Sequence, residues 1–125
     1  MSIESKKATV RAYYETAFDG QPELAVANYM GPQYIQHNPE ADNGPDAFIQ
    51  FVHALRAANP EMRLDIKRIF GEGNFVITHS HLILKPNEPG LALADYFRLK
   101  DGKVVEHWDV IQPVPNHSAN KNGMF

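Results

Sequence analysis

The sequence predicts an α+β fold, a conical barrel in which a curled antiparallel β-sheet carries three N-terminal helices on its concave face. Apolar residues recur at helical spacing in the first half of the chain, and after Pro60 they alternate at strand spacing. Turn residues then divide the second half into a meander of four strands. A sheet curled around helices stays open at one end, so we expect a pocket there.

The first half predicts helices over residues 2–18, 22–30 and 45–59. Gly20 is expected to end the first helix, because glycine tolerates the left-handed conformation of a helix cap. Residues 34–39 are expected to be extended, since the position before a proline is pushed out of the helical region.

The second half predicts strands over residues 62–67, 75–85, 91–99 and 103–112. Residues 113–125 are polar and rich in asparagine, and we expect them to be irregular, either a loose tail or a strap across a neighbouring surface. With no repeat and no linker, the chain predicts a single domain over residues 1–125.

Composition narrows the classes of partner and cofactor. Twelve Lys and Arg against fifteen Asp and Glu give a net charge of −3 with the signs interspersed, so we expect no nucleic-acid partner. The chain has no cysteine, which excludes disulfides and thiolate chemistry. Its apolar runs are far shorter than the about 20 residues of a membrane span, and no signal-like N-terminus is present, so we expect a cytoplasmic protein without a membrane partner.

Strand parity gathers polar side chains on one face of the predicted sheet. On the last strand, His107 and Asp109 share a face. A three-residue hairpin loop over 100–102 would place Asp95 opposite His107, whereas a two-residue loop would place Tyr96 there. We favour the three-residue loop because it gathers the carboxyl groups and the imidazole on one apolar face, where an unpaired charge is costly.

Further histidines are expected to join that face. His79 lies on the neighbouring strand, together with His81, and His37 lies in the extended stretch near the rim. The alternative for these residues is a metal site built from His37, His79, His81 and His107, with the spacing His79-x-His81 as its signal.

The opposite face of the sheet mixes aromatic, aliphatic and charged residues, namely Val104, Val110, Tyr96, Arg98, Glu106 and Trp108. Such a face is too apolar to be left in water. We expect a homodimer formed through this outer face.

Three segments resemble the SnoaL-like branch of the nuclear transport factor 2-like superfamily: YIQHNP at 34–39, DYFR at 95–98 and DGKVVEHWDVIQ at 101–112. The order of elements fits over essentially the whole chain. The resemblance implies a conical barrel, usually dimeric, and polyketide cyclases that close a ring by an intramolecular aldol reaction without a cofactor. It also implies an acid/base aspartate on the last strand, a position that Asp109 matches. Ketosteroid isomerase and scytalone dehydratase share this fold with different residues, so the fold alone does not transfer a substrate.

The resulting hypothesis is a lyase or isomerase that needs no cofactor and acts on a small carbonyl compound. Asp109 would take the α-proton, because an apolar cavity destabilises its ionised form. His107 would orient the substrate or donate to the enolate oxygen, and Asp95 would fix the tautomer of His107. His79 and His37 would complete the polar set.

Aromatic residues are expected to form the walls of the pocket. These substrate-binding candidates are Tyr14, Phe18, Tyr34, Phe48 and Phe97. Without the acid/base chemistry, the same pocket would be a non-catalytic site for a small ligand.

Overall fold

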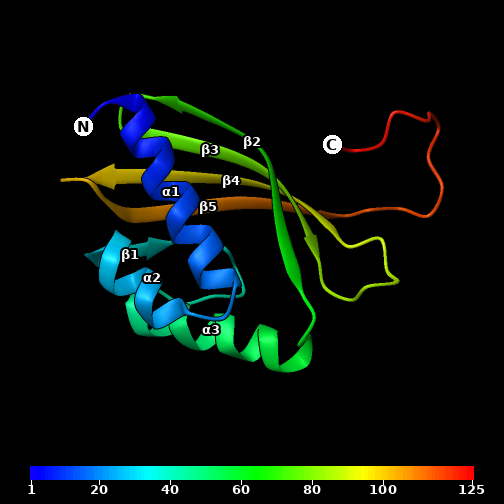
Figure 1. Cartoon of the computed structure of the whole chain (residues 1–125), viewed down its shortest axis with the longest axis horizontal. Helices are drawn as coiled ribbons and strands as arrows, with labels where there is room; N and C mark the ends of the chain where they lie inside the picture. Colours follow the sequence, from blue (N-terminus) through cyan, green and yellow to red (C-terminus); the bar gives the residue numbers. More distant parts are fainter.

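Three helices and five strands make up the fold in the computed structural model, which describes residues 1–125. The elements follow the order α1 (Ile3–Phe18), α2 (Pro22–Tyr29), β1 (Met30–Gln36), α3 (Pro45–Ala58), β2 (Arg63–Glu72), β3 (Phe75–Ile83), β4 (Leu91–Lys100) and β5 (Lys103–Pro113). The strands form one curled, unclosed sheet in the order β1-β5-β4-β3-β2, with α1 lying across it (Figure 1). The predicted α+β fold is confirmed.

The sheet is mixed and not wholly antiparallel, which corrects the prediction. Strands β2 to β5 form the expected antiparallel meander, but β1 pairs parallel with β5 at the edge of the sheet. An edge position suits β1 because Pro32 has no N–H to donate to a second neighbour. Because of this pairing, the loop 37–44 that follows β1 begins directly beside β5.

The hairpin between β4 and β5 has a two-residue turn, so the predicted three-residue loop is wrong. Lys100 pairs with Lys103, and the turn residues Asp101 and Gly102 have φ values of 52° and 76°. Positive φ at both central residues is the requirement of the tight turns that match strand twist.

A bulge two residues later restores the predicted faces. The register shifts between Arg98 and Leu99, so that Val105 has no partner on β4. Asp95 consequently lies opposite Asp109, and His107 lies opposite Phe97. The expected register, with Asp95 directly opposite His107, is therefore wrong. Asp95, His107 and Asp109 still share the concave face of the sheet, and the side chains of Asp95 and His107 are in contact.

Helix α1 supplies much of the core on that concave face. Ser2 caps the helix by accepting a hydrogen bond from the backbone N–H of Ser5. One side of the helix is buried against the sheet through Val10, Tyr13, Tyr14, Ala17 and Phe18. None of the three helices has the length and apolar character that a membrane crossing requires.

The residues after β5 have no regular structure, and they turn back toward the sheet (Figure 1). The ring of Phe125 stacks on His81 at 4.4 Å and on His79 at 5.5 Å, between ring centroids. The ammonium group of Lys67 lies 5.6 Å from the centroid of the same ring. The tail is therefore a strap that covers part of the outer side of β2 and β3.

Candidate functional site

A cavity of about 130 Å³ lies between the concave face and the helices. Most of its lining is apolar and comes from α1, α3 and the open ends of the strands: Tyr14, Phe18, Ala41, Phe48, Phe51, Leu55, Leu82, Leu84, Leu91, Leu93 and Ile111. The remaining lining residues are polar, namely Gln36, Asn38, Glu40, His107 and Asp109. The cavity thus combines an apolar wall with one group of hydrogen-bonding side chains.

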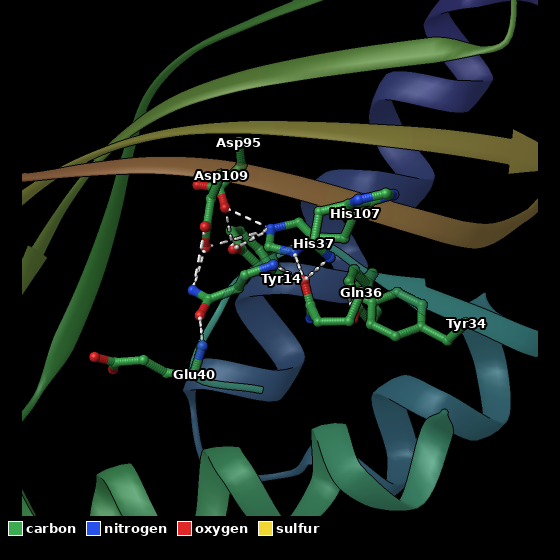
Figure 2. Close-up of polar contacts among 10 residues, drawn as sticks. Tyr14, Tyr34, Gln36, His37, Glu40, Asp95, His107 and Asp109 are labelled. Atoms are coloured by element: carbon green, nitrogen blue, oxygen red, sulfur yellow. Dashed lines mark hydrogen bonds and ion pairs between the residues drawn. The ribbon is translucent and has the colours of Figure 1, made fainter. Parts of the chain in front are cut away.

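Asp109 lies next to Asp95 and His107 (Figure 2). It is held in the cavity by Asn38, from the loop after β1. The Nδ2 of Asn38 donates to both carboxylate oxygens of Asp109, at 2.9 and 3.1 Å. The backbone N–H of Glu40 donates to Oδ1 of Asn38 at 2.8 Å. Because that N–H can only donate, it fixes the orientation of the amide and turns Nδ2 toward Asp109.

His107 is fixed at both ring nitrogens. Its Nδ1 lies 2.7 Å from Oε1 of Gln36, and its Nε2 lies 2.7 Å from Oδ1 of Asp95. Oε1 of Gln36 also accepts the backbone N–H groups of His37 and Asn38, at 3.1 and 3.0 Å, so this atom is the amide oxygen. An acceptor facing Nδ1 means that Nδ1 carries a proton.

The contact between Asp95 and His107 needs one further proton. With Nδ1 protonated, the 2.7 Å contact is a hydrogen bond only if a proton lies on Nε2 or on the carboxyl group of Asp95. The hydroxyl group of Tyr14 donates to the same Oδ1 atom at 2.5 Å. Asp95 and His107 therefore carry no net charge together, either as an ion pair or as a neutral acid and a neutral imidazole.

Burial governs the titration of this network. Asp95 is fully buried, and burial raises the pKa of its carboxyl group although hydrogen bonds from His107 and Tyr14 oppose the shift. Burial and the nearby carboxyl group of Asp95 also raise the pKa of the Tyr14 hydroxyl well above its ordinary value. The other oxygen of Asp95, Oδ2, is buried without a hydrogen-bond partner.

The two carboxyl groups have different surroundings. Asp109 lines the cavity, whereas Asp95 lies behind it, and Nε2 of His107 lies 3.9 Å from the nearest oxygen of Asp109. A proton acceptor that a ligand can reach thus lies next to a buried pair that holds a proton. This is the arrangement that proton transfer to and from a bound molecule requires.

One cluster has the residue types and proximity to hold a metal ion. Single ligand atoms of Asp95, His107 and Asp109 all lie within 4.8 Å of one another. The alternative set predicted from the sequence is not brought together, because His79 and His81 lie beside Phe125 on the outer side of the sheet.

The prediction that His79 shares a face with His107 is wrong. Thr78 is the residue of β3 that lies opposite Asp95, and it is fully buried on the concave side. His79 pairs with Ala94 and points to the outer side, where it contacts Arg68. The predicted alternation along β3 is present, but the other set of residues faces the concave side.

His37 also lies outside the cavity, which corrects its predicted place in the polar set. Its Nε2 lies 2.8 Å from Oε2 of Glu106, and its ring stacks on Trp108 at 4.7 Å between centroids. Burial opposes ionisation of Glu106, but hydrogen bonds from His37 and Arg98 outweigh it and lower the pKa of this carboxyl group. His37 thus anchors the loop 37–44 on the outer face.

Three of the five predicted wall residues line the cavity, namely Tyr14, Phe18 and Phe48. The other two are buried behind it. The ring of Tyr34 is stacked with that of His107, with 11° between their planes, and Phe97 packs 5.1 Å from the imidazole between centroids. These two rings support His107 and do not form the cavity wall.

The sequence pattern did not lead us to predict three of the polar lining residues, namely Gln36, Asn38 and Glu40. Parity within the stretch 34–39 could have identified the first two, since Tyr34, Gln36 and Asn38 alternate with His37. We predicted His37 instead, because imidazole is a common acid/base group. The amides nevertheless make the contacts to His107 and Asp109.

Comparisons with known proteins agree with this geometry at the level of family and fold. The family model of the SnoaL-like domain matches residues 10–107. TsrD from Streptomyces laurentii is similar in structure, with a TM-score of 0.73, 18% identity, and coverage of 89% of this chain and 90% of that one. A candidate SnoaL-like polyketide cyclase from Jannaschia sp. CCS1 gives a TM-score of 0.71, 20% identity, and coverage of 89% and 88%.

A de novo designed protein with a curved β-sheet is also similar, with a TM-score of 0.75, 18% identity, and coverage of 90% of this chain and 89% of that one. Since a designed scaffold matches this well, likeness of fold at such identities carries no activity. No curated protein matches the sequence.

Proposed function

Because the chain belongs to the SnoaL-like family, we propose that it catalyses acid/base chemistry, without a cofactor, next to the carbonyl group of a small organic molecule. The reaction would be an isomerisation or an intramolecular aldol cyclisation, which makes the protein an isomerase or a lyase. The observation that carries the proposal is the position of Asp109, exposed to the cavity and aligned by Asn38, beside the buried pair of Asp95 and His107.

The first step would be removal of the α-proton by Asp109. The carboxylate takes the proton, the electron pair of the C–H bond moves into an enolate, and the negative charge gathers on the carbonyl oxygen. For an isomerisation, Asp109 returns the proton to another carbon. For a cyclisation, the enolate carbon attacks a second carbonyl group of the same molecule, a C–C bond forms, and the new alkoxide takes the proton.

The buried pair would stabilise the enolate oxygen. Asp95 and His107 together hold a proton whose position can shift between nitrogen and oxygen within a 2.7 Å contact. A developing negative charge on the cavity side of His107 favours the state with the proton on Nε2, because the imidazolium ring then attracts that charge. Tyr14, with its raised pKa, keeps its proton and maintains its hydrogen bond to Asp95.

Exchange of α-hydrogens tests this proposal without knowledge of the natural substrate. Small cyclic and acyclic ketones are incubated in D₂O, and the appearance of deuterium at the α-carbon is followed by NMR. The wild-type protein is expected to accelerate exchange, and Asp109→Asn should lower that acceleration by about 100-fold or more, the contribution of a positioned base. Asp101→Asn, in the exposed turn between β4 and β5, is the matched control and should exchange like wild type.

Two outcomes would contradict the proposal. One is unchanged exchange in Asp109→Asn, and the other is the absence of any acceleration by wild type across the ketone panel.

The outer face supports the proposal of a homodimer. Phe75, Tyr96 and Val110 are large apolar side chains with 44%, 38% and 65% of their surface exposed. Val104, which we expected on this face, is instead fully buried because of the bulge at Val105. Val110→Lys should shift the sedimentation of the protein from dimer to monomer, and a wild-type protein that sediments as a monomer at all concentrations would contradict this.

A further inference from the structure

We propose that the cavity selects an uncharged ketone or aldehyde of about one six-membered ring in size, and that it rejects both anionic and multi-ring carbonyl compounds. The inference rests on the proposed function, which supplies the carbonyl group. The size and the charge of the ligand come from separate observations on the cavity itself.

Volume sets the upper size. The cavity measures about 130 Å³, whereas a dry protein cavity of about 150 Å³ holds a benzene molecule. A two-ring ketone needs substantially more room than this cavity offers. Buried walls restrict expansion, since Phe48 and Leu93 are each about 5% exposed or less and belong to the core.

Charge sets the class of ligand. The cavity lining contains two carboxyl groups, those of Asp109 and Glu40, and no lysine or arginine. The pair of Asp95 and His107 adds no net charge. A carboxylate, a phosphate or a nucleotide-linked thioester would therefore meet carboxyl groups with no cation to offset them, and such like-charge contacts weaken binding.

The distribution of polar groups sets the orientation. Hydrogen bonds link the polar lining residues into one group, from Gln36 to His107 and from Asn38 to Asp109. The remaining wall is apolar. A ligand with one carbonyl group and an otherwise apolar ring matches this division, and it presents its α-carbon to Asp109.

Three matched probes separate the two requirements: cyclohexanone, 3-oxocyclohexanecarboxylate and 1-decalone. Each is titrated into the wild-type protein, and binding is read from the NMR shifts of methyl groups that line the cavity, such as those of Leu93 and Ile111. Cyclohexanone should bind with saturable shifts. The carboxylate should bind about tenfold more weakly or worse because of like charge, and 1-decalone about tenfold more weakly or worse because of overpacking.

An enlarged cavity provides the control for size. Phe51 is partly buried at the edge of the core, so Phe51→Ala removes a wall residue and should admit 1-decalone while leaving the rejection of the carboxylate unchanged. The size argument is overturned if wild type binds 1-decalone as tightly as cyclohexanone, and the charge argument fails if the carboxylate binds as tightly. Absence of cyclohexanone binding overturns both.

Binding and exchange distinguish this inference from the proposed function. Asp109→Asn should still bind cyclohexanone, because the ring and the carbonyl group keep their other contacts. If the order of binding holds and no α-exchange occurs, the ligand class is supported and the acid/base reaction is wrong. If 1-decalone or the carboxylate exchanges faster than cyclohexanone, the reaction is supported and the ligand class is wrong.

Discussion

Nε2 of His107 lies 2.7 Å from Oδ1 of Asp95, and the other nitrogen of the ring already donates to Gln36. The pair consequently holds one proton in a fully buried position behind the cavity. This relationship makes the stability of the protein depend on pH in a defined direction.

Burial raises the pKa of Asp95 above its ordinary value of 3.8, so folding favours the protonated carboxyl group. The stability that this group contributes is present below its unfolded pKa and is lost as pH rises through the raised pKa of the folded state. Asp95→Asn removes the titration. The free energy of unfolding of wild type minus that of the variant should therefore decrease as pH rises above the ordinary pKa of 3.8, as measured by urea unfolding. A difference that grows with pH would contradict the assignment.

Gln36 is expected to fix the tautomer of His107. Gln36→Leu removes the acceptor for Nδ1–H and for two backbone N–H groups, and it should destabilise the fold by about 1–3 kcal/mol. The ¹⁵N shifts of the imidazole should then report a mixture of tautomers. Gln36→Glu keeps the acceptor and is the control, with Nδ1 still protonated. A single unchanged tautomer in Gln36→Leu would show that Asp95 alone fixes the tautomer of His107.

Asn38 is expected to align Asp109 for catalysis. Asn38→Ala leaves the carboxylate in the cavity without its partner, so the rate of α-exchange should fall about tenfold to 100-fold while the binding of the ketone changes little. Asn87→Ala, in the exposed loop between β3 and β4, is the matched control. An equal loss of binding and rate in Asn38→Ala would point to a role in holding the ligand.

The strap is expected to stabilise the outer side of β2 and β3. Deletion of Met124 and Phe125, both partly buried, should lower the free energy of unfolding by about 1–3 kcal/mol. The ring protons of His79 and His81 should shift, because they lose the stacked ring of Phe125. Because the strap lies on the side opposite the cavity, α-exchange should be unchanged. A truncated protein with wild-type stability would show that the strap contributes no packing energy.

Local patterns in the sequence located the centre of the site. His107 and Asp109 alternate with Glu106 and Trp108 on a strand whose other inward residues are apolar, so their shared face could be predicted. The prediction of this shared face is correct although the predicted length of the hairpin loop is wrong, because the bulge at Val105 compensates for the shorter turn. When a bulge lies nearby, the face on which a strand residue lies can thus be predicted more reliably than its partner on the neighbouring strand.

Long-range pairing could not be predicted in the same way. The parallel contact of β1 with β5 brings Gln36 and Asn38 to His107 and Asp109, yet no local pattern in residues 30–38 identifies that partner. On β3 both faces mix polar and apolar residues, so the sequence pattern does not show which face is buried. We predicted His79 on the concave face because of the chemistry of imidazole, but Thr78 and Ser80 are the buried residues. The strap and its contact with His81 depend equally on tertiary packing.

The central claim is that Asp109 meets the α-carbon of a bound ketone, and a crystal structure with cyclohexanone tests it most directly. We expect the ring in the apolar part of the cavity and an α-carbon within about 3.5 Å of a carboxylate oxygen of Asp109, the distance of a near-attack geometry. A ketone bound in the cavity with Asp109 turned away from every α-carbon would contradict the claim.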